Sequence, residues 1–374
     1  MKNRLNMGGV GLALAITLVL AACGGGGKID AAPSPSAGQV APATTTAKVS
    51  FYAASRFAEQ ASFGPTPALV AELQAKGFEK WIDEQLALPL VALDPAVAEE
   101  SYQLTKLQEI PPRIWMDTDA QMLRASLSAP DQLRWRVMWS LSNYIVVARS
   151  KGDTPPGNVH WLNLLYRQAF GNYGELLQQV TRNPFMSHYL DNDQNRPKST
   201  ECQQCAPNEN YARELMQLFS IGVVSLNPDG TAKRDNRGRF IETYTQADVE
   251  ELARALTGWA YDPQPSGRPE RNWGNWSKPM AQSTWPPERD AGRKVVMGRV
   301  FPAGQPAVKD LEDIAAMIMA HPNTAPFVSL RLIQHLVMSD PSPAYVGRVT
   351  GVFNSSAGNL RSVVKAILLD AEAR

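Results

Sequence analysis

The run P-N-E-N-Y-A-R-E-L-M-Q-L-F-S-I-G, Pro207–Gly222, is the most informative stretch of the sequence. With successive helical residues set about 100° apart, its apolar and polar side chains separate onto two arcs. The apolar arc holds Leu218, Tyr211, Leu215, Phe219, Ala212 and Met216, and the polar arc holds Glu209, Ser220, Arg213, Gln217, Asn210 and Glu214. The run therefore predicts a strongly amphipathic helix.

Both ends of this helix are also indicated. Asn208 can cap the first free N–H groups, and Gly222 can take the left-handed conformation that closes a helix. Two interpretations of the polar arc remain open. It can be a solvated face with a Glu209–Arg213 ion pair worth a few tenths of a kcal/mol, or it can line a pocket between helices.

A second amphipathic helix is predicted over Thr245–Trp259. Its apolar arc contains Val249, Leu252, Ala253, Leu256 and Trp259, and the acidic Asp248 also lies on that arc. A capping box between Thr245 and Asp248 explains this position without any catalysis. The alternative is a carboxylate turned toward a site.

The rest of the chain predicts a mainly α fold, a multi-helical orthogonal or bundle-like domain. There is no internal repeat and no alternation typical of a parallel sheet. Small exposed strands at Thr231–Arg234 and Arg239–Tyr244 flank D-N-R-G, which predicts one β-hairpin. Residues 262–305 are rich in proline and glycine and predict an irregular loop. Further helices are expected at 53–63, 66–76, 78–88, 117–128, 130–149, 159–169, 173–182, 184–190, 311–320, 325–338, 344–353 and 360–373.

The first residues have the features of a bacterial lipoprotein signal. Lys2 and Arg4 precede an apolar run that leads into Leu-Ala-Ala-Cys, a lipobox in which Cys23 becomes the lipidated first residue. Residues 1–22 are then the signal peptide, and 23–47 a flexible tether before a helical domain at 48–374. Gly24 stands where an inner-membrane retention aspartate would lie. We therefore expect an exported protein held on the outer membrane by its lipid.

The charge balance argues against a nucleic-acid partner. The chain has 37 Lys and Arg against 36 Asp and Glu. Removing residues 1–22 takes away two positive charges, so the balance becomes 35 against 36, a net charge of −1. Nothing basic enough to bind nucleic acid remains.

Few side chains suggest a metal or a known reaction. In an exported protein the C-x-x-C pair Cys202 and Cys205 favours a disulfide over a redox pair or a metal clamp with His188. The run Asp191–Asn195 resembles the start of a calcium loop but lacks its glycine and its glutamate. The templates of common hydrolases, kinases and dehydrogenases are absent. No metal site and no cofactor is assigned.

Several segments together resemble a bacterial family named domain of unknown function 1800. The segments are F-A-E-Q-A-S-F-G-P-T at 57–66, A-F-G-N-Y at 169–173, the run 209–222 with L-N-P-D-G-T at 226–231, 244–259, and A-I-L-L-D at 366–370. The resemblance implies an exported helical protein. It also implies a partner, a sulfatase-like exported protein of the domain of unknown function 1501 family. The matching polar signature falls on Asn172, Glu209, Asn210, Arg213, Glu214 and Asp248.

Two departures from the family pattern stand out. Family members commonly have His-Asp where this chain has Arg289-Asp290, so a role that needs that histidine is in doubt. Family members also continue with further helices beyond the position of Arg374. We therefore expect a shortened member or a core completed by something else.

These observations support two main hypotheses. The first is a lipid-anchored accessory or scaffold protein that binds another exported protein. The second is an enzyme, possibly hydrolase-like, that uses Glu209, Glu214 and Asp248 as acid, base or metal ligands and Arg213 to orient a substrate. In the enzyme the loop with the candidate ligand residues Trp273, Trp276, Trp285 and Asp290 would be a lid. A weaker third hypothesis has the three tryptophans stack on a glycan.

Overall fold

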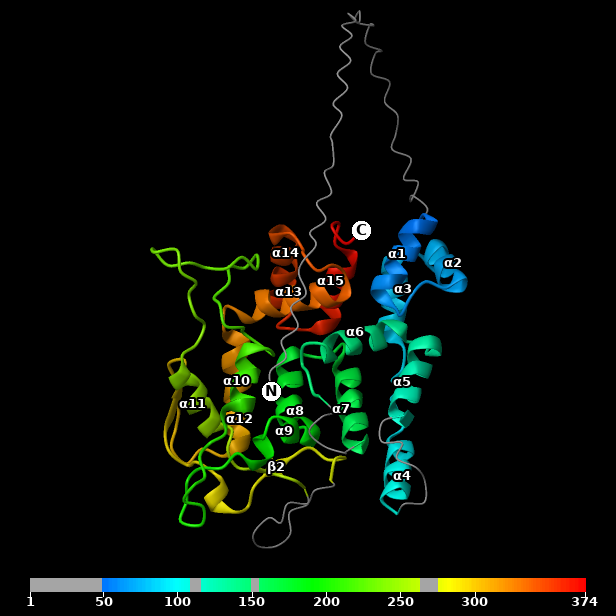
Figure 1. Cartoon of the computed structure of the whole chain (residues 1–374). Coiled ribbons are helices and arrows are strands. Elements are labelled where there is room, and N and C mark those ends of the chain that lie inside the picture. Colours follow the sequence, from blue (N-terminus) through cyan, green and yellow to red (C-terminus); the bar gives the residue numbers. More distant parts are fainter. Residues whose placement is uncertain (1–48, 108–115, 149–154, 263–274) are drawn as a thin grey trace, which may run out of the picture. The chain divides into compact units, whose positions relative to one another are not determined.

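Helices make up most of the structure, a computed structural model that describes residues 49–107, 116–148, 155–262 and 275–374 (Figure 1). The helices are α1 (Phe51–Ala61), α2 (Pro67–Lys76), α3 (Phe78–Ala87), α4 (Pro95–Lys106), α5 (Met116–Ser128), α6 (Gln132–Ser142), α7 (Pro155–Gln168), α8 (Tyr173–Thr181), α9 (Pro184–Tyr189), α10 (Glu209–Gln217), α11 (Gln246–Ala255), α12 (Ala307–Ala320), α13 (Thr324–Leu336), α14 (Pro343–Ser355) and α15 (Leu360–Leu369). The short elements are β1 (Trp259–Ala260), β2 (Ala281–Gln282), β3 (Lys294–Val296), β4 (Arg299–Phe301) and the 3₁₀ turns η2 (Asn192–Gln194) and η3 (Pro286–Glu288). The predicted mainly α fold class is confirmed. Within the described residues, no helix combines the length and the apolar character needed to cross a membrane.

Helix α6 lies at the centre of the packing. It contacts α1, α3 and α5 from the first part of the chain, α7 that follows it, and α13 from the last part. Its buried apolar side chains are Leu133, Trp135, Val137, Met138 and Leu141. The Trp135 ring lies 4.4 Å from the ring of Tyr166 on α7, a contact worth about 0.5–1.5 kcal/mol beyond the buried area. Distant parts of the chain therefore share one core.

Helix α10 has the buried face that its periodicity predicts. Tyr211, Ala212, Leu215 and Met216 are all buried, and the Tyr211 hydroxyl lies 2.8 Å from Thr181 Oγ1 on α8. The helix ends at Gln217, five residues before the predicted end. After that point the N–H groups of residues 221 and 222 both donate to the Met216 carbonyl, which closes the helix in a tight turn.

Three parts of the chain differ from the sequence prediction. Helix α4 was not expected. Ala98 is its one fully buried side chain, and its apolar pattern is sparse. The irregular loop at 262–305 contains the antiparallel pair β3 with β4, and its strand β2 pairs with β1, which lies just before the loop where the predicted 245–259 helix was expected to end. The predicted hairpin at 231–244 turns at Gly238 as expected, but isolated bridges rather than a continuous ladder hold it.

The last helix packs against the first ones. Helix α15 contacts α1, α3, α13 and α14. Lys365 on α15 forms ion pairs with Asp83 and Glu79 on α3 at 2.7 and 3.0 Å. Arg361 Nη2 also donates to the Leu86 carbonyl at the end of α3 at 2.8 Å. Helix α15 thus completes the packing of the first helices of the chain.

Gly222 gives a direct test of the turn after α10. Its φ is +68°, and a Cβ atom there would meet a ring carbon of Phe327 at 2.6 Å. Gly238 has a similar φ of +78° but nothing within 4 Å. We expect Gly238→Ala to cost about 1 kcal/mol of unfolding free energy from backbone strain, and Gly222→Ala about 1–3 kcal/mol more from the clash. Urea unfolding followed by circular dichroism measures both. Equal losses of unfolding free energy in the two variants would show that the Phe327 ring moves aside without cost.

Candidate functional site

The polar arc of α10 faces the first turn of α11, where three side chains form a hydrogen-bonded cluster. Arg213 Nη2 donates to the Glu209 carboxylate at 2.8 Å and to Gln246 Oε1 at 3.0 Å. Gln246 Nε2 donates to the same Glu209 oxygen at 2.9 Å. The side chains of Arg213 and Glu209 are 39% and 36% exposed, so solvent screens the pair to about 0–1 kcal/mol. This geometry is that of a solvated face shared by two helices.

Asn172 and Asp248 cap other helices. Asn172 Oδ1 accepts from the first backbone N–H groups of α8, and its Nδ2 donates to the Ala357 carbonyl at 2.7 Å. Asp248 forms the capping box with Thr245 at the start of α11 and accepts from the Met297 N–H at 2.6 Å. Burial raises the pKa of Asp248, but these hydrogen bonds outweigh it and hold the pKa below its usual range. Within the described residues, no hydrogen bond joins either side chain to the α10 cluster.

Asn210 and the calcium-like run at 191–195 connect neighbouring elements. Asn210 Nδ2 donates to Asp191 Oδ2 at 2.9 Å. The buried Asp193 carboxylate accepts from the Tyr261 hydroxyl at 2.9 Å and lies 3.1 Å from His188 Nδ1. These contacts tie η2 to α9, α10 and the residue after β1. In the part of the chain that the structure describes, no three His, Cys, Asp or Glu side chains are grouped so that they could hold a metal.

Glu214 differs from the other predicted carboxylates. It is half-buried, and its Oε2 is enclosed without a hydrogen-bond partner among the described residues. Burial raises the pKa of Glu214 above its usual range, and the nearby charge of Arg213 offsets part of this effect. Burial also raises the pKa of Tyr244, which is close enough to Arg213 and Glu214 for both charges to act on it. The described residues therefore give Glu214 Oε2 no hydrogen bond that would stabilise the ionised carboxylate.

The pKa direction of Glu214 predicts how stability changes with pH. A carboxyl whose folded pKa lies above its usual value of 4.5 keeps its proton longer in the folded state, so it lowers stability as pH rises above 4.5. We expect Glu214→Gln to raise the Tm at pH 7.5, with the gain disappearing at pH 4. Glu209→Gln, which removes an exposed ion pair, is the control and should change the Tm little at either pH. A Glu214→Gln gain that is the same at both values would show that charge is not its cause.

Cys202 and Cys205 are joined by a disulfide. The bond closes a turn in which the backbones of Ser199 and Cys202 exchange hydrogen bonds of 3.1 and 3.2 Å. This turn leads into the N-cap of α10, where the buried Asn195 side chain accepts from the Asn208 N–H at 2.8 Å. Sulfurs bonded to each other are not thiolate ligands, so in this state the pair shapes the entry to α10.

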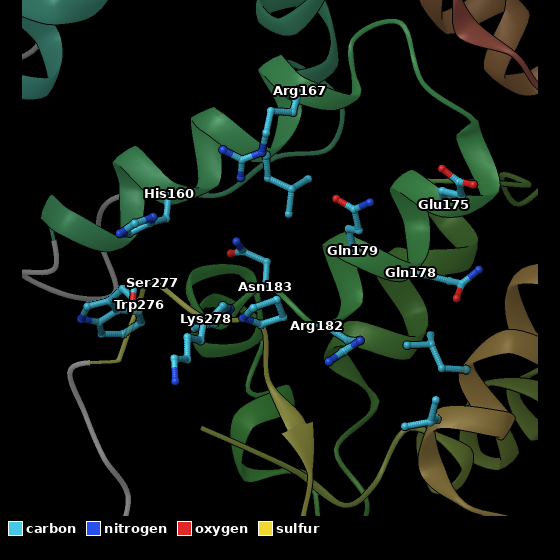
Figure 2. Close-up of a pocket in the computed structure, with 15 residues that line it drawn as sticks. His160, Arg167, Glu175, Gln178, Gln179, Arg182, Asn183, Trp276, Ser277 and Lys278 are labelled. Atoms are coloured by element: carbon cyan, nitrogen blue, oxygen red, sulfur yellow. The ribbon is translucent and has the colours of Figure 1, made fainter. Parts of the chain in front are cut away.

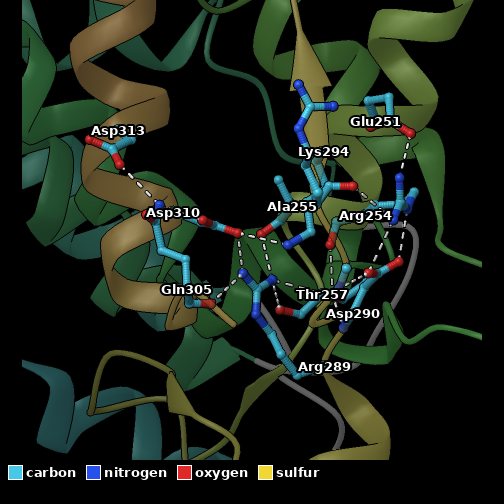
Figure 3. A network of polar contacts seen from close by, with 12 residues as sticks. Glu251, Arg254, Ala255, Thr257, Arg289, Asp290, Lys294, Gln305, Asp310 and Asp313 are labelled. Carbon is cyan, nitrogen blue, oxygen red and sulfur yellow. Dashed lines mark hydrogen bonds and ion pairs between the residues drawn. The ribbon is translucent and has the colours of Figure 1, made fainter. Parts of the chain in front are cut away.

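Ion pairs fix the described part of the predicted lid to α11 (Figure 3). The Asp290 carboxylate accepts from Arg254 Nε and Nη2 at 2.8 and 3.2 Å. Arg289 Nη1 donates to the carbonyls of Ala255 and Thr257 at 2.8 and 3.0 Å. Asp290 is thus held in a bidentate pair, and the segment around it is anchored where the sequence suggested a movable cover.

Asp310 on α12 completes this network from inside the protein (Figure 3). Its carboxylate is fully buried and pairs with Arg289 and with Lys294 Nζ at 3.1 Å, and it accepts from Gln305 Nε2 at 2.6 Å. Lys294 is also fully buried. Burial and the charge of Arg289 lower the pKa of Lys294, and Asp310 partly opposes this. Two cations therefore depend on one carboxylate.

Removing that carboxylate tests the network. Asp310→Asn would leave Arg289 and Lys294 without their counter-charge, and we expect a loss of about 3–5 kcal/mol of unfolding free energy. Glu312→Gln, on the same helix but with a side chain that is 53% exposed, should cost less than about 1 kcal/mol. Guanidinium unfolding measures both. A loss for Asp310→Asn no larger than the control would contradict a structural role.

The three tryptophans of the predicted glycan platform are not equivalent. Trp273 lies outside the described residues, and Trp285 is half-buried. Trp276 is 5% exposed, with its ring set edge-on to the rings of Phe185 and Tyr261 at 6.3 and 5.9 Å. Trp276 is therefore a packed wall residue that offers little surface for a sugar to stack on.

Trp276 lines a cavity of about 300 Å³ that the sequence pattern did not predict. It lies between α7, α8 and the segment 276–279 (Figure 2). Its ionisable lining residues are His160 and Arg167 from α7, Glu175 from α8, Arg182 directly after α8, and Lys278. Burial lowers the pKa of His160, Arg167 lowers it further, and Glu99 on α4 partly opposes this. Arg167 lies on α7 and Arg182 at the end of α8, and no pattern in the sequence shows that these positions meet.

Comparison with known proteins identifies a family. No curated protein and no solved structure matches the chain significantly. A family profile described as protein of unknown function, DUF1800, matches residues 56–374, which is most of the chain and nearly all of its described part. The chain belongs to the DUF1800 family.

Proposed function

We propose that the protein is a lipid-anchored accessory or scaffold protein whose helical domain binds another exported protein. In this proposal Cys23 carries the lipid after residues 1–22 are removed, and residues 23–47 tether the domain to the outer membrane. The lipobox and the composition of the tether support the anchor. The observation that carries the binding function is an apolar surface on α5 and α6.

Helix α5 exposes an apolar stripe to solvent. Met116, Leu123 and Leu127 are 64%, 59% and 75% exposed. At about 100° per residue, their spacing of seven and four residues places them on one face, with Ala120 between the first two. The opposite side of α5 packs against α4, α6 and α7. Helix α5 thus has two apolar faces. One packs against the neighbouring helices, and the other, the stripe, is exposed.

A hollow of about 560 Å³ adjoins the stripe. Leu123 lines it together with Phe63 and Trp139, which are 38% and 45% exposed. Large apolar side chains that gather on an exposed surface mark sites of association. Tryptophan is also among the residues that contribute most to binding energy at protein interfaces.

The stripe fits a partner helix with apolar residues at the same spacing. Such a helix would lie in the groove through anchors three and four residues apart. Acidic Asp117 lies in the first turn of α5, and Arg124 lies further along. We therefore propose a partner segment with basic side chains near one end. The family resemblance suggests its source, an exported sulfatase-like protein of the domain of unknown function 1501 family.

The geometry gives no support to an enzyme based on the predicted carboxylates. Asp248 is used in a capping box, and Glu209 is paired on an exposed surface. Of these three carboxylates, only Glu214 has a buried oxygen without a hydrogen-bond partner. A shared acid–base or metal site needs groups that converge. We therefore propose binding rather than catalysis.

Binding can be measured between two defined proteins. The full chain and the sulfatase-like protein are produced in a Gram-negative host, extracted in detergent, purified, and titrated by biolayer interferometry. We expect a complex of defined stoichiometry. The double variant Leu123→Glu with Leu127→Glu should weaken it at least about tenfold, since charge would enter the apolar contact. Val300→Glu, on β4 and 47% exposed, is the matched control and should bind like the wild type.

The outcomes test the α5 surface and the lipid anchor separately. Equal affinity of the wild type and the α5 double variant would exclude the stripe as the contact. The absence of any complex between the two folded proteins would overturn the proposed partner. Cys23→Ala should lose incorporation of labelled palmitate and keep its affinity, because the change alters no residue of the α5 surface. Palmitate incorporation into Cys23→Ala would overturn the proposed anchor.

A further inference from the structure

The cavity between α7, α8 and the segment 276–279 has an excess of positive charge. Arg167, Arg182 and Lys278 line it, and Glu175 is the single carboxylate among its described lining residues, so these three cations and one carboxylate have a net charge of +2. Lys278 also lies 3.7 Å from Asp262, but both side chains are largely exposed, which weakens this pair. The lining is therefore suited to a ligand with negative charge.

Arg182 is held ready for such a ligand. Its Nε donates to the Met280 carbonyl at 2.9 Å, and its guanidinium lies 5.7 Å from the ring centre of Trp259. These contacts fix the plane of the guanidinium and leave its two terminal nitrogens without a hydrogen-bond partner in the described chain. A planar guanidinium with free terminal N–H groups matches the two oxygens of a carboxylate or a phosphate.

A second guanidinium and an amide face the same space. The side chains of Arg167 and Gln179 form no hydrogen bond or ion pair with any described residue (Figure 2). Arg167 comes from α7, Gln179 comes from α8, and Arg182 directly follows α8. The two guanidinium groups therefore reach the cavity from different sides, and each can form charge-assisted hydrogen bonds with an anion.

Part of the remaining wall is apolar and closely packed. Leu164 from α7 and Leu311 from α12 line the cavity together with Trp276. Trp276 and Phe185 pack so closely on Gly157 that a Cβ atom there would approach them to 3.0 and 2.8 Å. A preformed cavity of about 300 Å³ with apolar walls and a few polar groups is at the small end of the range for ligand sites.

We propose that this cavity binds a small organic anion, with its carboxylate or phosphate group held by Arg167 and Arg182 and its less polar part against Leu164 and Leu311. This site is separate from the protein-binding surface on α5, and it requires no partner. The two proposals can therefore fail independently.

Isothermal titration calorimetry on the full chain in detergent tests the site. The probes are D-glucuronate, D-glucose 6-phosphate and uncharged D-glucose, which share a ring and differ in charge. We expect at least one of the two anions to bind with a Kd in the millimolar range or below, and glucose to show no binding. Arg167→Ala and Arg182→Gln should each weaken the anion at least about tenfold, because each removes a charge-assisted hydrogen bond.

Arg237→Ala is the control for a general loss of positive charge. This arginine lies in the exposed turn of the 231–244 segment and should leave binding unchanged. Arg167 contacts no described residue through its polar atoms, so its variant should remain folded, and thermal melting checks this. Glucose binding as tight as the anions, anion binding unaffected by both arginine variants, or no anion binding by the folded protein would each overturn the proposal.

Discussion

The fully buried carboxylate of Asp310 determines how the second half of the protein is arranged. Burial of an isolated charge is so unfavourable that counter-charges must be brought to it. They come from Arg289 and Lys294, in a segment that has only short strands of its own. Arg289 reaches the end of α11 at the same time. The next residue after Asp310, Leu311, lines the cavity, so one helix supports both the ion network and the cavity wall.

Several polar side chains that seemed suited to chemistry stabilise the fold instead. Asn172 and Asp248 supply acceptors to the free N–H groups at helix starts, which need partners in any buried helix. Asn195 bonds to α11 and to the residue before α10, and Asp290 neutralises Arg254. Of the polar residues that the family resemblance pointed to, Asn172 and Asp248 therefore hold backbone geometry. Glu214 is the exception, because its enclosed oxygen has no partner.

Sequence periodicity predicted α10 and α11, which have a continuous buried face, and missed α4, which has none. The arcs of α10 and α11 were predicted nearly residue by residue, because Tyr211, Leu215, Val249 and Leu252 repeat at helical spacing and polar caps mark the starts. Helix α4 buries too little of its surface to show that repeat. Strands β3 and β4 have three residues each, too few to establish an alternating pattern, and a glycine turn at Gly298 joins them. Periodicity identifies which face of a helix is polar, but not what that face meets. For this reason the cavity between α7 and α8 could not be predicted.

The packing of α15 against α1 and α3 also determines the order of events while the chain is made. The first three helices emerge from the ribosome early, but the surfaces they share with α15 stay uncovered until residues beyond Lys365 have been added. Helix α6 likewise waits for α13. During synthesis the growing chain therefore carries apolar surfaces whose partners do not yet exist, which favours binding by chaperones and delays compaction. For the export proposed above such a delay is an advantage, because a chain that crosses a membrane unfolded must not complete its core first.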